Sequence, residues 1–378
     1  MRRFGGMFAG LLACISIIGI APAHAAGVVF AVDAYAGKAK ILHRFHGRVD
    51  GKSPFSQLTN IGSTLYGTTW KGGGGGCGGD GCGTVFSVDR ITHAEKVLYA
   101  FTGGKDGGNP QAGLIKSGSI LYGTATSYGA GHGVVFAFDL KSGRERVVHA
   151  FNYTDGDGPF GKLLLANGVL FGTTAGGGAS GEGVVFSLDP ATGAESVVYS
   201  FGGGGDGTSP LGSLIGLSGT LYGTTSLGGS KNRGTVFGVS LATGAETYRY
   251  SFRGADGAYP GSAGLTYFDG LLFGTTDDGG AFDSGIVFTV DPASGNESVL
   301  YSFGSKEADG LIPNGNLVQF GGNLYGTTLG GGSNDWGTVF SITPAGDETV
   351  LYSFTFTTHG ITAGLRKVHS RFYGTASE

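Results

Sequence analysis

The chain has few charged residues and no long apolar run beyond its first 25 residues, and both shortages exclude classes of protein. Charged residues make up 14% of the 378, with 24 Lys and Arg against 28 Asp and Glu. Nucleic-acid-binding domains usually present a basic stripe, so a net charge of −4 argues against a nucleic-acid partner. After residue 25, no segment approaches the roughly 18 apolar residues that a membrane-spanning helix needs.

Cysteine is also scarce. Only three occur, Cys14 near the N-terminus and Cys77 and Cys82 in a glycine-rich insertion. Structural zinc sites normally use four ligands, so two thiols alone make a poor metal site. In an oxidising compartment we expect Cys77 and Cys82 to form a local disulfide. The sequence also lacks the G-x-S-x-G, H-E-x-x-H and C-x-x-C motifs of common hydrolases and zinc enzymes.

Residues 1–25 have the pattern of an export signal. Arg2 and Arg3 precede an apolar stretch from Phe4 to Ala21, and the small residues around His24 fit a cleavage site. Loss of these two arginines changes the net charge from −4 to −6. We therefore expect a mature chain of residues 26–378 that forms one domain in the periplasm or outside the cell.

A competing interpretation takes the segment ending in Cys14 as a lipoprotein box, with Cys14 lipidated and retained. It leaves apolar residues directly after the lipid, where a polar tether is expected. The cleaved signal peptide is the better interpretation.

A segment of about 51 residues recurs seven times, and each full copy holds four strand-like runs separated by glycine-rich turns. The first landmark is a G-x-V-F run, whose glycines are Gly27, Gly83, Gly133, Gly183, Gly234, Gly285 and Gly337. A second Phe follows in each copy, at Phe45, Phe101, Phe151, Phe201, Phe252, Phe303 and Phe354. The third landmark is an L-(Y/F)-G-T run, with F-Y-G-T in the last copy and an earlier Leu seven residues before it. A period near 50 with four short strands is typical of a β-propeller blade.

The two ends of the mature chain complete each other. It begins with two runs that match the third and fourth strands of a copy, Val28 to Asp33 and Lys40 to Phe45. It ends with runs that match the first and second strands, at Leu365 and from Phe372 to Thr375. We predict an all-β, seven-bladed propeller of four-stranded antiparallel blades, in which two N-terminal and two C-terminal strands form the last blade and cover the sheet edges. A β-solenoid is the rival, but its repeats are usually about 20–29 residues long.

The compound motifs L-Y-G-T-T, G-T-V-F, T-G-x-E, Y-S-F and G-G-x-D-G-x-x-P together resemble the GloVer tandem repeat of bacterial choice-of-anchor exported proteins. The resemblance covers nearly all of the mature chain, although the seventh copy has Thr358-His359-Gly360 where D-G-x-x-P is expected. It implies an exported propeller and no established activity. Because the sequence ends four residues after Gly374, we expect release rather than attachment to an anchor.

One acidic position repeats in the loops that join consecutive copies, within the D-G-x-x-P motif. Its members are Asp50, Asp106, Asp157, Asp206, Asp256 and Asp309. A ring of carboxylates offers the oxygen ligands that Ca²⁺ prefers. The simpler interpretation is that each Asp closes its own turn by accepting backbone hydrogen bonds. We therefore predict no cofactor, with calcium as the alternative.

The position just before each G-x-V-F glycine varies most between copies. Its residues are Cys82, His132, Glu182, Arg233, Ser284 and Trp336. The same loops also contain Trp70, Tyr128, Lys231, Asp277, Asp278, Asp283 and Asp335. In an antiparallel meander, these loops share one face with the loops between copies. Variable loops on a rigid scaffold often bind ligands, whereas unselected drift at exposed loop tips gives the same pattern.

The leading hypothesis is a monomeric, non-enzymatic protein that binds a glycan or surface polymer on this face. The alternative is a carbohydrate-active hydrolase or lyase that uses Glu182 and Asp283 as acid and base, with Trp70 or Trp336 stacking on sugar. A purely structural role is the third hypothesis. His43 and His149 occupy a position where other copies mostly have Tyr, so we interpret them as packing residues and not as metal ligands.

Overall fold

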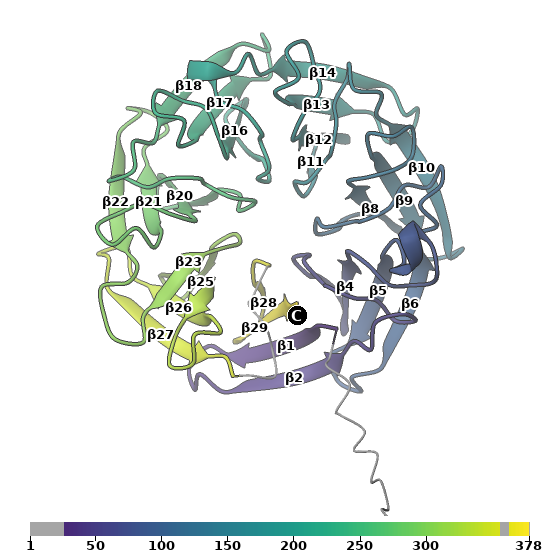
Figure 1. Ribbon diagram of the computed structural model, residues 1–378, viewed down its shortest axis with the longest axis horizontal. Helices are drawn as coiled ribbons and strands as arrows, with labels where there is room; N and C mark the ends of the chain where they lie inside the picture. Colours follow the sequence, from purple (N-terminus) through teal and green to yellow (C-terminus); the bar gives the residue numbers. More distant parts are fainter. Residues whose placement is uncertain (1–25, 356–362, 378) are drawn as a thin grey trace, which may run out of the picture.

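The computed structural model describes residues 26–355 and 363–377, so the predicted signal peptide and Thr358-His359-Gly360 lie outside the described residues. Seven antiparallel sheets stand around a central axis (Figure 1). This confirms the seven-bladed β-propeller. The only helical segments in the described ranges are two single 3₁₀ turns, η1 (Cys77–Gly79) and η2 (Gly204–Asp206). No helix there has the length and apolar character of a membrane span.

Each blade has four strands, which we call A to D from the axis outwards. Blade 1 contains β3 (Thr59–Ile61), β4 (Thr64–Thr69), β5 (Thr84–Asp89) and β6 (Glu95–Ala100). Blade 2 contains β7 (Ile115–Ser117), β8 (Ile120–Ala125), β9 (Val134–Asp139) and β10 (Arg144–Ala150). Blade 3 contains β11 (Leu164–Ala166), β12 (Val169–Thr174), β13 (Val184–Leu188) and β14 (Glu195–Ser200). Blade 4 contains β15 (Ile215–Leu217), β16 (Thr220–Thr225), β17 (Thr235–Ser240) and β18 (Glu246–Ser251).

The remaining blades follow the same order. Blade 5 contains β19 (Thr266–Phe268), β20 (Leu271–Thr276), β21 (Ile286–Val290) and β22 (Glu297–Ser302). Blade 6 contains β24 (Val318–Phe320), β25 (Asn323–Gly331), β26 (Thr338–Ile342) and β27 (Glu348–Ser353), with an additional β23 (Gly310–Pro313) that pairs with the lengthened end of β25. Blade 7 contains β28 (Arg366–Val368), β29 (Arg371–Ala376), β1 (Val28–Asp33) and β2 (Ala39–Arg44). The sequence did not predict β23.

Blade 7 closes the ring from both ends of the chain. Strand β1 pairs antiparallel with β29 from Val28 opposite Ala376 to Asp33 opposite Arg371. In Figure 1 the purple β1 and β2 lie beside the yellow β28 and β29. The predicted closure is therefore confirmed, and the edges of β1 and β29 pair with each other.

The A strands do not include the repeated Leu, which the sequence placed in the first strand of each copy. Each has three residues and begins directly after the repeated Leu, as β3 begins after Leu58. The Leu side chain is buried under the blade, with no exposed surface at Leu58 or Leu365. The repeated Leu therefore anchors the start of the innermost strand from just outside it.

The two Phe series meet at the interfaces between blades. Each second Phe packs edge-to-face on the G-x-V-F Phe of the next blade, for example Phe151 on Phe186 with ring centroids 5.1 Å apart. The pairs across the other interfaces are Phe354 with Phe30, Phe45 with Phe86, Phe101 with Phe136, Phe201 with Phe237, Phe252 with Phe288, and Phe303 with Phe340. Edge-to-face pairs add about 0.5–1.5 kcal/mol beyond the area that they bury. Both series therefore stabilise the contact between neighbours.

The glycine of G-x-V-F and the proline of D-G-x-x-P form a second contact between blades. At Gly183, whose φ is +102°, a Cβ atom would lie 2.6 Å from Cδ of Pro210 in the next blade. The residue before Pro210 is Ser209, with φ +53°, and its N–H donates to the Glu182 carbonyl oxygen at 3.0 Å. The same glycine–proline contact recurs at five other interfaces, from Gly27 with Pro54 to Gly285 with Pro313. These two motifs repeat together because they touch.

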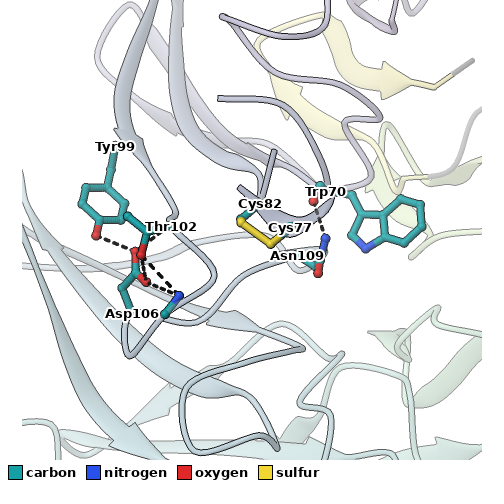
Figure 2. The surroundings of a disulfide bond; sticks show 8 residues. Trp70, Cys77, Cys82, Tyr99, Thr102, Asp106 and Asn109 are labelled. Atoms are coloured by element: carbon teal, nitrogen blue, oxygen red, sulfur yellow. Dashed lines mark hydrogen bonds between the residues drawn. A yellow bond between two sulfur atoms is a disulfide. The ribbon is translucent and has the colours of Figure 1, made fainter. Parts of the chain in front are cut away.

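The predicted disulfide is present. Cys77 and Cys82 are bonded with their Cα atoms 5.3 Å apart, and the bond closes the insertion between β4 and β5 (Figure 2). Cys82 has no exposed surface and belongs to the core between blades 1 and 2. The disulfide therefore fixes the inserted loop to that core.

Candidate functional site

The loops from B to C and from D to the next A lie on one face, as predicted, because they pair with each other. Isolated antiparallel bridges join Gly108 to Ser127 and Thr208 to Leu227. In each case the first residue lies in the D–A loop that leads into a blade, and the second lies in the B–C loop of that blade. Equivalent bridges occur in blades 1, 3 and 5. We call this side of the ring the loop face.

The repeated Asp closes its own loop, which confirms the simpler interpretation. In Figure 2 the Asp106 carboxylate accepts hydrogen bonds from the Thr102 and Gly104 N–H groups and from the Tyr99 hydroxyl at 2.9 Å. The prediction was wrong for one copy, where the equivalent residue is Asp155 and not Asp157. Asp155 accepts from the Asn152 N–H at 2.9 Å.

The variable position before each strand C glycine has a shared backbone role. Its carbonyl oxygen accepts a hydrogen bond from the next blade's D–A loop in five copies, at 2.7 Å for Cys82 and 3.0 Å for Glu182 and Ser284. Because the backbone makes this contact, the side chain is free to differ between blades. This explains how a single column contains six residue types.

Two of these variable side chains contact the next blade. His132 lies with Nδ1 3.1 Å from Asp157 Oδ1, and its ring packs edge-on against Tyr153. The Arg233 guanidinium donates to the Tyr259 hydroxyl at 3.1 Å and lies 5.2 Å from the centroid of its ring. These contacts account for both side chains as links between adjacent blades.

The other predicted residues of this face are spread around the ring. Tyr128, Asp283 and Asp335 are exposed at positive φ in the B–C loops of blades 2, 5 and 6. The Asp283 carboxylate accepts from the Gly279 N–H at 3.2 Å within its own loop. Glu182 lies on blade 3, so blade 4 stands between it and Asp283.

The remaining predicted residues differ in their surroundings. Asp278 pairs through its backbone with Ala258, and Lys231 is exposed. Trp336 is partly buried and packs against the core between blades 6 and 7. Trp70 is also partly buried, and its ring lies edge-on to Phe55 with centroids 5.8 Å apart.

A cavity of about 240 Å³ occupies the centre of the ring, and we call it the central cavity. Its lining comes from all seven blades, mainly from the two or three residues that precede each repeated Leu. The side chains that matter for recognition are Phe55, Gln57, Gln111, Phe160, Lys162, Ser213, Ser262, Asn314 and Asn316. Leu329, in the lengthened end of β25 in blade 6, also lines it, which connects the cavity with the loop face.

Lys162 is the one cationic side chain among the residues that line the central cavity. Its Nζ donates to Gln57 Oε1 at 3.1 Å, from blade 3 to blade 1. The Gln57 amide in turn donates to the Leu365 carbonyl oxygen of blade 7 at 3.0 Å. Burial, followed by the charge of nearby Arg366, lowers the pKa of Lys162 to about 8. The lysine is therefore held in place by neutral partners, without an acidic one among the cavity-lining residues.

Asp277 directly follows β20, at the same place in its blade as Trp70 and Leu329. Its two carboxylate oxygens are 2.7 Å from the point where Gly261 would carry a Cβ atom. Burial and then the charge of Asp278 raise the pKa of Asp277 to about 7. The Asp277 carboxyl therefore changes between its protonated and ionised forms near neutral pH.

Of the predicted site residues, Trp70 contacts Phe55 of the cavity lining, and Asp277 lies at the equivalent place in blade 5. The sequence interpretation missed Phe55, Gln57, Phe160, Lys162 and the two asparagines. A signal was present, because the residue before the invariant Leu also differs in most copies: Gln57, Gly113, Lys162, Ser213, Gly264, Asn316 and Gly364. That column lies at the start of the innermost strand, where side chains from all blades converge.

Solved structures share this fold at low sequence identity. The hydrazine synthase of Kuenenia stuttgartiensis is 16% identical over 78% of each chain, with a TM-score of 0.51. A chain of the mitotic checkpoint complex is 10% identical, with 100% of this chain and 99% of that chain covered and a TM-score of 0.53. At such identities the likeness shows the fold alone. No curated protein matches the sequence.

The repeat itself has a match. The family profile described as the Gloeobacter/Verrucomicrobia repeat matches residues 18–237 and 204–378, which together include all seven blades. This agrees with the resemblance to the GloVer repeat that the motifs show. The chain therefore belongs to the Gloeobacter/Verrucomicrobia repeat family.

Proposed function

We propose that this protein is an exported, non-enzymatic binding protein whose ligand is a glycan or surface polymer, held at the central cavity on the loop face. The observation that carries the proposal is the lining of that cavity. Two partly exposed aromatic rings, Phe55 and Phe160, accompany side-chain amides, two serine hydroxyls and Lys162.

This combination suits a sugar. The C–H faces of a pyranose pack on aromatic rings, and its hydroxyl groups exchange hydrogen bonds with amides such as those of Gln111 and Asn314. The volume of about 240 Å³ is below the roughly 300–1,000 Å³ of sites for drug-sized ligands. The cavity therefore takes one sugar or chain end, with the rest of the polymer on the loop face near Trp70.

Export agrees with the leader of residues 1–25 and with the Cys77–Cys82 disulfide, because disulfides persist in oxidising compartments. The mature protein is then periplasmic or extracellular. It acts as a monomer, since ring closure already pairs β1 with β29.

A glycan screen of residues 26–378 tests the proposal, with thermal shift as the readout because a ligand that binds only the native state raises the Tm. For a glycan that binds, Phe160→Ala is expected to weaken affinity about tenfold, which corresponds to about 1.4 kcal/mol. Lys162→Gln is expected to weaken it too. Arg233→Ala is the matched control, because Arg233 lies on the same face but contacts Tyr259 and not the cavity.

If both cavity variants keep the wild-type affinity for the glycan and Arg233→Ala loses affinity, the binding site lies in the outer loops and not in the cavity. A screen without any glycan hit would contradict the ligand class.

One observation favours a second function, a carbohydrate-active hydrolase. Asp277 has a pKa raised to about 7, which suits a general acid at neutral pH. This role replaces the Glu182 and Asp283 pair, which lies on separate blades. Release of reducing sugar by the wild type, abolished in Asp277→Asn with binding retained, would establish it.

A further inference from the structure

A polar cluster repeats on the outer part of the ring, between the D strands of adjacent blades. Two residues before each second Phe stands a Tyr or His, and in six copies its polar tip contacts the Asp of the following loop. The next blade contributes the first Glu of its own D strand. In the Tyr250 cluster, the hydroxyl donates to Asp256 Oδ2 at 2.6 Å and to Glu297 Oε2 at 3.1 Å.

Two of these clusters contain a cation supplied by the chain. Arg249 lies 3.3 Å from Glu246 Oε2 and 3.5 Å from Asp206 Oδ1. Lys306 Nζ lies 3.0 Å from Glu348 Oε2 in another cluster. The space beside these carboxylates therefore accepts a positive charge.

A His takes the place of Tyr in two clusters, His43 between blades 7 and 1 and His149 between blades 2 and 3, and the His149 cluster is the more compact of the two. His149 Nε2 is 3.1 Å from Asp155 Oδ2, and one ligand atom each from His149, Asp155 and Glu195 lie within 4.8 Å of one another. No ion pair joins this trio to a Lys or Arg within residues 26–355 and 363–377. It therefore has two carboxylates and an imidazole, without a cation such as Arg249 or Lys306 in the two clusters above.

The Oε1 atom of Glu195 is buried and has no hydrogen-bond partner among the described residues. The same is true of the equivalent Glu in the other clusters: Glu95, Glu145, Glu246, Glu297 and Glu348. A cation bound between His149, Asp155 and Glu195 would give this oxygen a partner.

We propose that His149, Asp155 and Glu195 bind a divalent transition-metal ion of the zinc class. One imidazole nitrogen and two carboxylate oxygens are ligands that Zn²⁺ accepts, with a fourth position left for water. Binding replaces the His149–Asp155 hydrogen bond by two metal bonds and gives the Glu195 carboxylate a partner. Because His149 and Asp155 belong to β10 and the loop after it, and Glu195 to β14, the ion links blades 2 and 3. This differs from the packing role that the sequence favoured for His149.

The repeats provide matched variants. His149→Tyr converts the cluster into the Tyr99, Asp106 and Glu145 cluster of the preceding interface, so the fold is expected to tolerate it. Glu195→Gln removes one ligand with little change in shape. Tyr99→His is the reverse change, and it places an imidazole beside Asp106 and Glu145. His369→Asn changes an exposed histidine at φ +54°, a backbone conformation that Asn tolerates, and it serves as the control.

The experiment uses tag-free residues 26–378, stripped with a chelator and titrated with Zn²⁺ by calorimetry, with Co²⁺ absorption to report the ligand geometry. Wild type and His369→Asn are expected to bind one ion and to gain Tm. Affinity is expected to fall at least about 100-fold in His149→Tyr and Glu195→Gln, since even outer-shell changes cost 10–100-fold. Tyr99→His is expected to bind a second ion.

Two results would overturn the proposal. One is a wild type that takes up no zinc, which leaves the His149–Asp155 hydrogen bond as the role of this cluster. The other is equal uptake by wild type, His149→Tyr and Glu195→Gln, which assigns the metal to other histidines such as His43 and His46 near Asp50.

Discussion

Replacement of Glu297 by Gln is expected to make the protein more stable above neutral pH. Glu297 begins β22, and its Oε1 atom is buried without a hydrogen-bond partner in the described structure. Burial raises the pKa of Glu297 from its ordinary value of 4.5 to about 7, against the lowering effect of the Tyr250 hydrogen bond. Gln keeps the shape of the side chain and an oxygen for the Tyr250 hydroxyl, but it never becomes charged.

The sign of the pH effect follows from the two pKa values. Below pH 4.5 the carboxyl is protonated in both the folded and the unfolded chain, and its contribution to stability is fully present. As the pH rises through about 7, the folded chain must ionise a buried group and this contribution is lost. The difference between 4.5 and about 7 corresponds to about 3 kcal/mol as an upper limit. Because the side chain is only half-buried, we expect about 1–2 kcal/mol.

Guanidinium unfolding of wild type and variant between about pH 4 and about pH 8 measures this effect, since only the wild type has the ionising group. The gain of Glu297→Gln should grow with pH across this range. Glu307→Gln, at an exposed loop position, is the control and should run parallel to the wild type. A Glu297→Gln protein that loses stability equally at every pH would refute the reasoning, because it would mean that the carboxylate is better stabilised than the carboxylic acid.

Three further predictions concern the repeated motifs. Gly183→Ala should destabilise the protein by at least about 2 kcal/mol in chemical unfolding, since its Cβ would overlap a proline of the next blade, whereas Gly168→Ala at open space should cost less. Replacing Cys77 and Cys82 by Ser should cost about 2 kcal/mol from lost loop restriction, and reductant should lower the wild-type Tm but not that of the variant. Phe186→Ala should cost about 3–5 kcal/mol, because the ring is fully buried against its neighbour, and a loss below 1 kcal/mol would contradict the importance assigned to the Phe pairs.

The fold was predictable from the sequence because each blade interface repeats the same contacts. Each Phe, Gly or Pro that contacts a residue of the next blade recurs at a fixed spacing. Phe186 and Pro210 are examples, and the spacing of such residues is what predicts the blades from the sequence. Even the join between Val28 and Ala376 follows from two incomplete copies. The extra strand β23 did not follow, because it depends on local pairing of Gly310 with Gly331.

The candidate site was less predictable, because it depends on positions that do not repeat. Variation before the strand C glycine drew attention to His132 and Arg233, but those side chains contact the adjacent blade. Lys162 looked like an ordinary residue next to a core Leu, and only the convergence of seven blades brings it to Gln57. Distance from the axis decides which variable column reaches the central cavity, and sequence spacing does not reveal that distance.

The join in blade 7 also dictates the order of folding. Strand β1 is synthesised first, yet its partner β29 ends at Ala376, at the other extreme of the described chain. Until then β1 and β2 have an unpaired edge, which is prone to wrong association. Contacts between residues so far apart form slowly, so blades 1 to 6 are expected to assemble before the circle is completed. A chain secreted in the unfolded state would reach its final form only after it has fully crossed the membrane.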